Sequence, residues 1–145
     1  MFYQILLLPL ISLLVAQSAK FFIKANKLSF NLKNLTAYAG MPSGHSAMIV
    51  SLAAIIGLED GWRSPLFAVS FILAIIVIRD ALGIRRYLGQ HGRMLNALVK
   101  DLDEDKMLDQ HYPRLLENIG HTPTQALAGG LIGFFVSLIG YWLIG

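Results

Sequence analysis

Long apolar segments separated by polar stretches constrain this chain more than any other feature. Four segments are mostly apolar: Phe2 to about Phe22, Pro42 to about Leu58, Leu66 to Gly83, and Pro123 to Gly145. Because a helix crosses a bilayer in ~20 residues, each is a candidate span, although the second is short. Charged residues make up 14% of the chain, whereas soluble domains carry roughly a quarter. The sequence therefore predicts an all-α integral membrane bundle, one domain of residues 1–145 with about four transmembrane helices.

The polar stretch from Ile84 to Gly120 holds most of the charge. Its apolar residues recur at helical spacing at Leu95, Leu98, Val99 and Leu102, which predicts an amphipathic helix. The acidic run of Asp101, Asp103, Glu104 and Asp105 is interpreted as a solvated face or loop, with a metal site as the weaker alternative. The chain contains no Cys, which excludes disulfides and thiolate metal sites. A net charge of +3 is too small to favour a nucleic-acid partner.

The basic residues predict the orientation in the membrane. Only Arg63 lies in the second polar stretch, whereas the other 11 of the 12 Lys and Arg residues lie in the first and third or at the span ends that border them. These are Lys20, Lys24, Lys27, Lys33, Arg79, Arg85, Arg86, Arg93, Lys100, Lys106 and Arg114. Loops rich in Lys and Arg stay in the cytoplasm. We therefore expect the first and third stretches, with the amphipathic segment, to be cytoplasmic and both termini to lie outside. The first apolar segment has no basic residue before Lys20, so it is interpreted as a retained span and not as a signal peptide.

The stretch from Gly40 to Ser46 combines Pro, Gly, Ser and His immediately before an apolar segment. Pro42 fits the first turn of a helix, and Ser43, Gly44 and His45 would then lie where backbone N–H groups are unpaired. The positive end of a helix dipole binds phosphate readily. His45 can carry a proton near neutral pH. An ordinary helix start with Ser as its cap is the alternative interpretation.

Three polar clusters are expected to meet at the cytoplasmic ends of the spans. They are Ser43 to His45, Arg79 and Asp80 with Arg85 and Arg86, and Gly120 to Gln125, with Lys20 at the same level. Arg and Lys suit phosphate oxygens, and two imidazoles could supply a nucleophile and an acid. Each group also has a structural alternative. The cations could be membrane anchors, Asp80 could only pair with an Arg, and His121 with Pro123 could only begin a helix.

Two further features have structural interpretations. Gly129 and Gly133 form a G-x-x-x-G pair, which predicts close packing between membrane helices. His91 and His111 lie in the polar stretch and are expected to be solvated.

The motifs carry a resemblance to a known superfamily. Pro42-Ser43-Gly44-His45 resembles the second signature of the type-2 phosphatidic acid phosphatase and vanadium haloperoxidase superfamily. The stretch from Gly120 to Gly129 resembles the end of its third signature, and Asp80 to Arg86 is similar to its divergent bacterial and plant branch. The resemblance covers the chain from Gln17 to Gly133.

The resemblance implies a role for each matching residue. His121 matches the nucleophile that forms a phosphohistidine, and His45 matches the acid that protonates the leaving oxygen. Ser43 and the backbone of Gly44 match phosphate ligands. Lys20 resembles the lysine of the first signature, although no Arg-Pro follows it. The resemblance implies neither a metal nor another cofactor.

Two positions depart from the superfamily pattern. The signature Arg expected six residues before the nucleophile is Leu115, so Arg85 or Arg86 would have to replace it. The acid that orients the nucleophile is Gln125, whose oxygen can accept a hydrogen bond but cannot stabilise an imidazolium as a carboxylate does. Asp80 is the alternative residue for this role.

These observations together predict a lipid phosphatase in a bacterial plasma membrane, with its site facing the cytoplasm. The substrate class is a lipid-linked phosphate monoester or diphosphate, such as phosphatidylglycerophosphate, phosphatidate or an isoprenyl phosphate. Because four spans are few for this superfamily, a homodimer could supply the missing packing surface. A non-catalytic protein that binds phospholipid headgroups or scaffolds a partner is the main alternative. A small transporter is disfavoured because the polar residues gather at one membrane face and not at the midplane.

Overall fold

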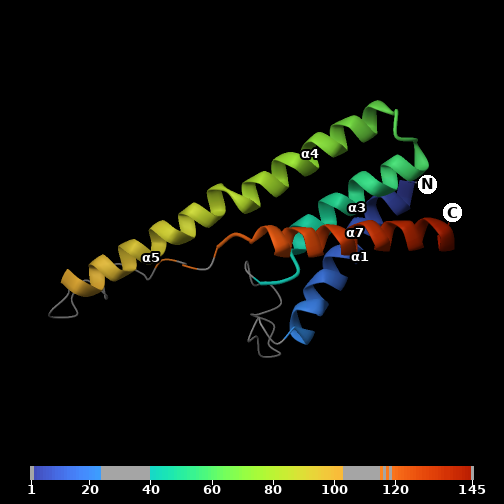
Figure 1. Cartoon of the computed structure of the whole chain (residues 1–145). Helices are drawn as coiled ribbons and strands as arrows, with labels where there is room; N and C mark the ends of the chain where they lie inside the picture. Colours follow the sequence, from blue (N-terminus) through green and yellow to red (C-terminus); the bar gives the residue numbers. More distant parts are fainter. Residues whose placement is uncertain (1, 24–39, 103–114, 116, 118, 145) are drawn as a thin grey trace.

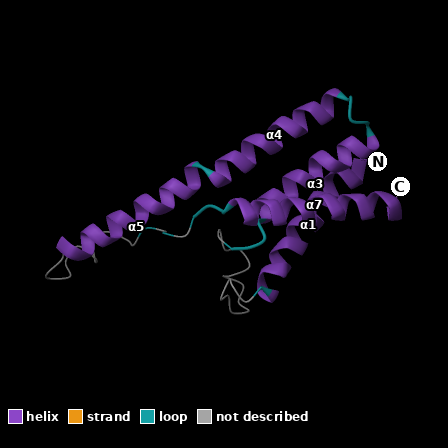
Figure 2. Cartoon of the chain, in the orientation of Figure 1, coloured by secondary structure: helices purple, strands orange, loops and turns teal. Residues whose placement is uncertain are grey.

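The structure is a computed structural model that describes residues 2–23, 40–102, 115, 117 and 119–144. Within these ranges every regular element is a helix and no strand occurs (Figure 2). The helices are α1 (Phe2–Phe22), α3 (Gly44–Glu59), α4 (Pro65–Leu82), α5 (Ile84–Leu102) and α7 (Pro123–Ile144). The predicted all-α fold is therefore confirmed. Most of the acidic run, most of the first polar stretch and His111 lie outside the described residues.

Helix α3 is the centre of the bundle, because it packs against α1, α4 and α7 (Figure 1). Most of its residues are buried, and many of these are Ala, Ser and Gly, which let neighbouring helices approach closely. At 16 residues it spans about 24 Å. Three other helical segments are long and apolar enough to cross a membrane, namely Tyr3–Phe22, Pro65–Lys100 and Pro123–Ile144. The chain is thus an integral membrane protein, and the second of the four predicted spans is a shorter helix between the others.

Small residues on α7 let its backbone touch the backbone of α3. A Cβ at Gly129 would overlap the carbonyl oxygen of Ser43, and a Cβ at Gly133 would overlap that of Ala47. Farther along, the Ser51 and Ser137 hydroxyls lie 2.6 Å apart, and the Ser137 hydroxyl also donates to the Ser51 carbonyl at 2.9 Å. The close-packing role predicted for the G-x-x-x-G pair is therefore confirmed.

Helix α3 begins two residues later than the sequence predicted, at Gly44 and not at Pro42. Ser43 is the N-cap, with an extended backbone (φ −73°, ψ 115°), and Gly44 is the first helical residue. Pro42 therefore lies before the cap and not in the first turn, and its peptide bond with Met41 is cis. Ser43 satisfies the free N–H of Ser46 with its hydroxyl at 3.3 Å, which is the usual action of a serine cap.

Helices α4 and α5 form a long, nearly continuous rod that is inclined to α3 and α7 (Figure 1). Gly83 separates them with a non-helical backbone (φ −102°, ψ −93°). Helix α5 confirms the predicted amphipathic helix, and it extends beyond the bundle (Figure 1). At the opposite end of α4, Ser64 caps the helix and Pro65 occupies its first position, as helix starts favour.

Four helix ends meet at one end of the bundle. These are the last turn of α1, the first turns of α3 and α7, and the last turn of α4, while the two chain termini lie at the other end (Figure 1). The polar clusters singled out in the sequence all occur at this shared end.

Candidate active site

His121 is held in place by its backbone. Gly120, just before it, has a positive φ of 91°, which favours glycine. A Cβ at Gly120 would lie 2.7 Å from the backbone nitrogen of Arg86, so glycine is also required for close approach to α5. The backbone N–H of His121 then donates to the carbonyl of Ala81 at 3.1 Å. These contacts place His121 against the joint between α4 and α5, directly before α7 begins.

The imidazole of His121 lies in a buried, positively charged setting. Only 5% of the residue is exposed. Burial lowers the pKa of His121 below its ordinary value of 6.5, and the positive charge of Lys20 lowers it further. The nearby Gln125 side chain opposes this shift, whereas His45 and Arg85 add to it. Burial and the nearby positive charges thus favour the neutral form of His121, the form that a nucleophile requires.

Lys20 occupies the end of a buried stripe on α1. The residues at positions 8, 12, 16 and 20 recur every four residues, and each is at most 2% exposed. Residues four apart lie on one helix face, so the stripe that packs against the bundle carries the Lys20 ammonium to its end. The sequence placed Lys20 at this level, and the structure buries its side chain almost completely.

The start of α3 is packed against both α1 and α7. Ser43 is fully buried, and its backbone N–H donates to the Gln125 carbonyl at 3.0 Å. The Ser46 hydroxyl donates to the Ser43 hydroxyl at 3.0 Å. A Cβ at Gly44 would lie 2.8 Å from Leu13 and 3.2 Å from the Gln17 amide nitrogen, both on α1. Gly44 thus has a packing function beside the phosphate-binding one that the resemblance implies.

His45 is the second residue of α3 and is half-buried. It lies in the first helical turn, where the backbone N–H groups are unpaired and the helix dipole is positive. Its protonated form lowers the pKa of His121, as the charges of Lys20 and Arg85 do. Four of the residues predicted for the site thus lie within electrostatic reach of one another.

Gln125 closes the first turn of α7 through a capping box. Its side-chain oxygen accepts from the Thr122 N–H at 2.9 Å, and the Thr122 hydroxyl accepts from the Gln125 N–H at 3.3 Å. This reciprocal pattern is the T-x-x-Q form of the motif. In the described part of the chain the buried Nδ1 of His121 has no hydrogen-bond partner. The Gln125 oxygen is therefore engaged with Thr122, and it does not hold Nδ1.

Asp80 and the two arginines occupy the joint between α4 and α5. Asp80 Oδ2 lies 2.7 Å from Arg85 Nε, and both side chains are more than a third exposed. The structural alternative considered for Asp80, pairing with a nearby Arg, is thus what the geometry shows. The Arg86 side chain is exposed and makes no ion pair with any described residue, although its backbone contacts Gly120. The structure thus brings Arg85 toward His121 but leaves the Arg86 side chain at the surface.

Comparisons with known proteins identify the family. Residues 2–136 match the divergent PAP2 family. The chain belongs to this family. A relative is the uncharacterized membrane protein YuiD of Bacillus subtilis (strain 168), which is 36% identical over 92% of this chain and 91% of its own length. No solved structure matches the chain. The kinship inferred from the sequence motifs is thus confirmed.

The structure locates both departures of this divergent PAP2 chain from the superfamily pattern. Leu115, which stands where the signature Arg is expected, is exposed and lies beside α5. Gln125, which stands where the orienting acid is expected, belongs to the capping box. Among the described residues, no group of three or more His, Asp and Glu could hold a metal ion.

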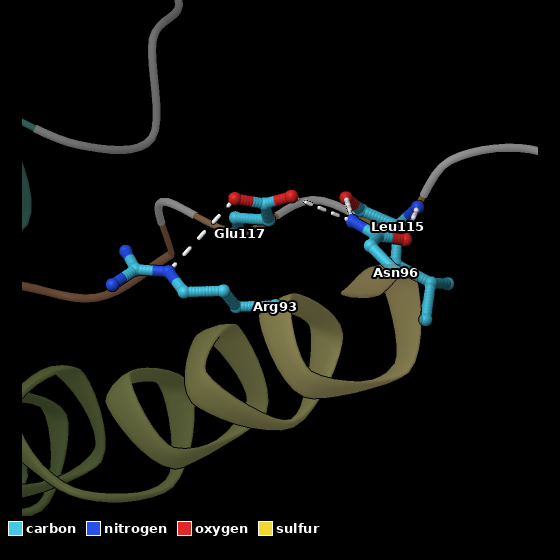
Figure 3. Close-up of polar contacts among 4 residues, drawn as sticks. All are labelled: Arg93, Asn96, Leu115 and Glu117. Atoms are coloured by element: carbon cyan, nitrogen blue, oxygen red, sulfur yellow. Dashed lines mark hydrogen bonds and ion pairs between the residues drawn. The ribbon is translucent and has the colours of Figure 1, made fainter. Parts of the chain in front are cut away.

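Sequence reasoning missed the residues that position the segment before His121. Asn96 of α5 donates to the Leu115 carbonyl and accepts from the Leu115 N–H, both at 2.9 Å (Figure 3). Gly89 lets the chain at Glu117 approach α5 closely, since a Cβ there would lie 2.6 Å from the Glu117 carbonyl. Gly89 and Asn96 are seven residues apart and lie on one face of α5, which is a sign in the sequence of a contact at this face. This spacing does not indicate which segment of the chain makes the contact.

Proposed function

We propose that this protein is a membrane phosphatase that hydrolyses a lipid-linked phosphate monoester or diphosphate. Phosphatidylglycerophosphate, phosphatidate and isoprenyl phosphates belong to this substrate class. The observation that carries the proposal is the setting of His121, a buried imidazole whose neutral form is favoured and which lies within electrostatic reach of Lys20 and His45. Membership of the divergent PAP2 family supports the same chemistry. A neutral nucleophile beside fixed positive charge is the arrangement that phosphoryl transfer needs.

The proposed reaction has two steps. In the first, a nitrogen of neutral His121 attacks phosphorus, and the bond to the leaving oxygen breaks while His45 donates a proton to that oxygen. In the second, water attacks the phosphohistidine, His45 accepts the water proton, and inorganic phosphate leaves. Lys20, Arg85 and the N–H groups at the start of α3 would stabilise the charge on the phosphate oxygens. The Ser43 hydroxyl is the further phosphate ligand that the resemblance implies.

Phosphate release by purified, folded protein tests this proposal. His121→Ala should abolish turnover of a lipid monophosphate, and Arg63→Gln, at the far end of the bundle, is the matched control. His45→Ala should reduce turnover of a lipid monophosphate strongly and that of an activated aryl phosphate much less, since an aryl oxide leaves without a proton. Near-wild-type turnover by His121→Ala would show that the nucleophile is misassigned.

We also propose that the site faces the cytoplasmic side of a bacterial plasma membrane. The 11-to-1 distribution of Lys and Arg supports this orientation. Lys100 and Arg63 are exposed at the two ends of the α4–α5 rod, and the chain has no native Cys. In intact cells an impermeant thiol reagent should label Arg63→Cys and not Lys100→Cys. The reverse pattern would place the site, and its substrate, at the outer leaflet.

A second candidate function is non-catalytic binding of phospholipid headgroups. The Nδ1 of His121, which has no hydrogen-bond partner among the described residues, favours it, because the superfamily's nucleophile is oriented by an acid and Gln125 is engaged elsewhere. This alternative predicts that folded protein binds vesicles containing a lipid phosphate and releases no phosphate from any member of a substrate panel.

A further inference from the structure

Helix α5 exposes a continuous apolar stripe. The side chains that form it are all about half or more exposed: Ile84, Tyr87, Leu88, Met94, Leu95 and Leu98. At 100° per residue they fall within a sector about 120° wide. His91 is also exposed within this sector and is its one polar member among the described residues. Elsewhere on α5, basic residues occur at Arg86, Arg93 and Lys100.

The face of α5 roughly opposite the stripe is already occupied by residues of the segment that leads to His121. Asn96 holds the backbone of Leu115 and also donates to Glu117 Oε1 at 2.9 Å (Figure 3). Arg93 lies 3.8 Å from the same Glu117 carboxylate (Figure 3). Gly89 permits the close backbone approach of this segment. Among the described residues the apolar stripe therefore remains the open face of the helix.

The place of α5 along the rod points to the membrane surface. The 18 residues of α4 span about 27 Å, close to the ~30 Å thickness of a hydrocarbon core, so Ile84 emerges at the headgroup level. Helix α4 also exposes apolar side chains, among them Ile72 and Ile76, as a helix in contact with lipid would. Tyr87 is of the type enriched at membrane interfaces. Helix α5 continues almost in line with α4 (Figure 1), so docking along the surface requires α5 to bend at Gly83, where the backbone is non-helical.

Charge favours a lipid surface over a second copy of the chain. Helix α5 carries four basic residues, Arg85, Arg86, Arg93 and Lys100, against the single acidic Asp101. An anionic leaflet attracts such a helix, whereas a second α5 repels it. With Tyr87 and Met94 at its edges, the stripe is wider than the contact face of a two-stranded coiled coil. Tyr87 and Met94 are uncharged, so they cannot form the flanking ion pairs that select a partner helix in a coiled coil.

We infer that α5 docks on the membrane surface, with its apolar stripe in the headgroup–acyl boundary of an anionic leaflet. The opposite face then remains in water, and Leu115 and Glu117 stay bound along the helix. The docked helix would hold the joint at Ala81 and Arg86, and with it His121, at the level of the lipid headgroups. Only this last consequence rests on the proposed function.

Single-cysteine spin labels test the docking directly, because the chain has no native Cys. Leu95→Cys places the label on the stripe, and Ala97→Cys is the matched control on the opposite, exposed face. The full-length protein is reconstituted in vesicles that contain phosphatidylglycerol. We expect the label at 95 to be several-fold more accessible to oxygen than to a water-soluble nickel chelate, and the label at 97 to show the reverse.

Two results would overturn the inference. Equal, high accessibility of both labels to the nickel chelate would show that α5 projects into water. Strong spin–spin coupling between labels at 95, or disulfide formation between copies of Leu95→Cys, would show that a second copy covers the stripe. The measurement does not use enzyme activity, so its failure leaves the proposed phosphatase function untouched.

Discussion

Replacing Gly129 by Ala should disturb the candidate site by separating α7 from α3. A Cβ at this position would overlap the carbonyl oxygen of Ser43, a backbone atom that cannot rotate away. Ser43 is itself fixed by its hydrogen bonds with Gln125 and Ser46. To reach an ordinary non-bonded separation, the two helices would have to move apart by about 1 Å or more.

The size of the effect follows from these contacts. Overpacking of this kind destabilises by about 1–3 kcal/mol, and the better helix propensity of Ala offsets up to about 1 kcal/mol. We therefore expect the free energy of unfolding to fall by about 1–2 kcal/mol. Gly129 lies on α7, the helix that begins just after His121, and it contacts Ser43, the N-cap of α3. Turnover should fall further, by as much as ~10²-fold, since a displacement of about 1 Å can reduce a rate that much.

Gly130→Ala is the matched control for this prediction. It makes the same chemical change on the next residue of α7, where a Cβ would meet only Val50 at 3.4 Å, an ordinary contact. Unfolding in detergent and phosphate release should be measured for both variants. If Gly129→Ala were as stable and as active as Gly130→Ala, the inferred backbone contact between α3 and α7 would be wrong.

Three further predictions concern the site and its support. Because burial and the charge of Lys20 lower the pKa of His121, the acid limb of kcat/KM for an activated aryl phosphate, which leaves without a proton from His45, should lie below pH 6.5. Lys20→Met should move this acid limb to higher pH and Lys20→Arg should not; equal limbs in pH–rate profiles would contradict this. Gln125→Glu should raise turnover at pH 7, because one carboxylate oxygen can keep the capping bond while the other accepts from His121. An unchanged rate would show that Gln125 is only a cap. Asn96→Ala removes both hydrogen bonds to the Leu115 backbone and should lower the free energy of unfolding by about 1 kcal/mol. For a soluble short-chain substrate, kcat should fall while KM changes little. If only the stability changed, Asn96 would have a structural role and no role in positioning His121.

The helices could be predicted from the sequence because their signals are local. Apolar length, the Ser cap before Gly44 and the spacing of Gly129 and Gly133 are each carried by residues close together in the chain. The start of α3 was placed slightly early, since Pro42 suits a first turn but lies before the cap. An error of this size is expected at helix ends, where caps and not periodicity decide the boundary.

The site was only partly predictable, because its supports are tertiary contacts. Neither the Ala81 carbonyl that accepts from His121 nor the close approach at Gly120 has a signature in the sequence. Gln125 is different, since T-x-x-Q at a helix start is a readable capping box. It was assigned to catalysis by resemblance, whereas the structure shows that its oxygen already has the local partner Thr122.

The backbone of His121 and its imidazole ring are held to different degrees in this fold. Its backbone is fixed by the bond to Ala81 and by the packing of Gly120 against α5. The buried Nδ1, in contrast, has no partner within the described ranges. An unpaired buried polar atom is costly, and it persists where another group completes it or where function requires it. The backbone thus positions the imidazole, while its orientation is left to a group outside these contacts. A bound phosphate near Lys20 would be one such group. The rate of Gln125→Glu tests whether the imidazole needs an acceptor from the protein itself. A carboxylate at position 125 would supply the missing acceptor from within the chain.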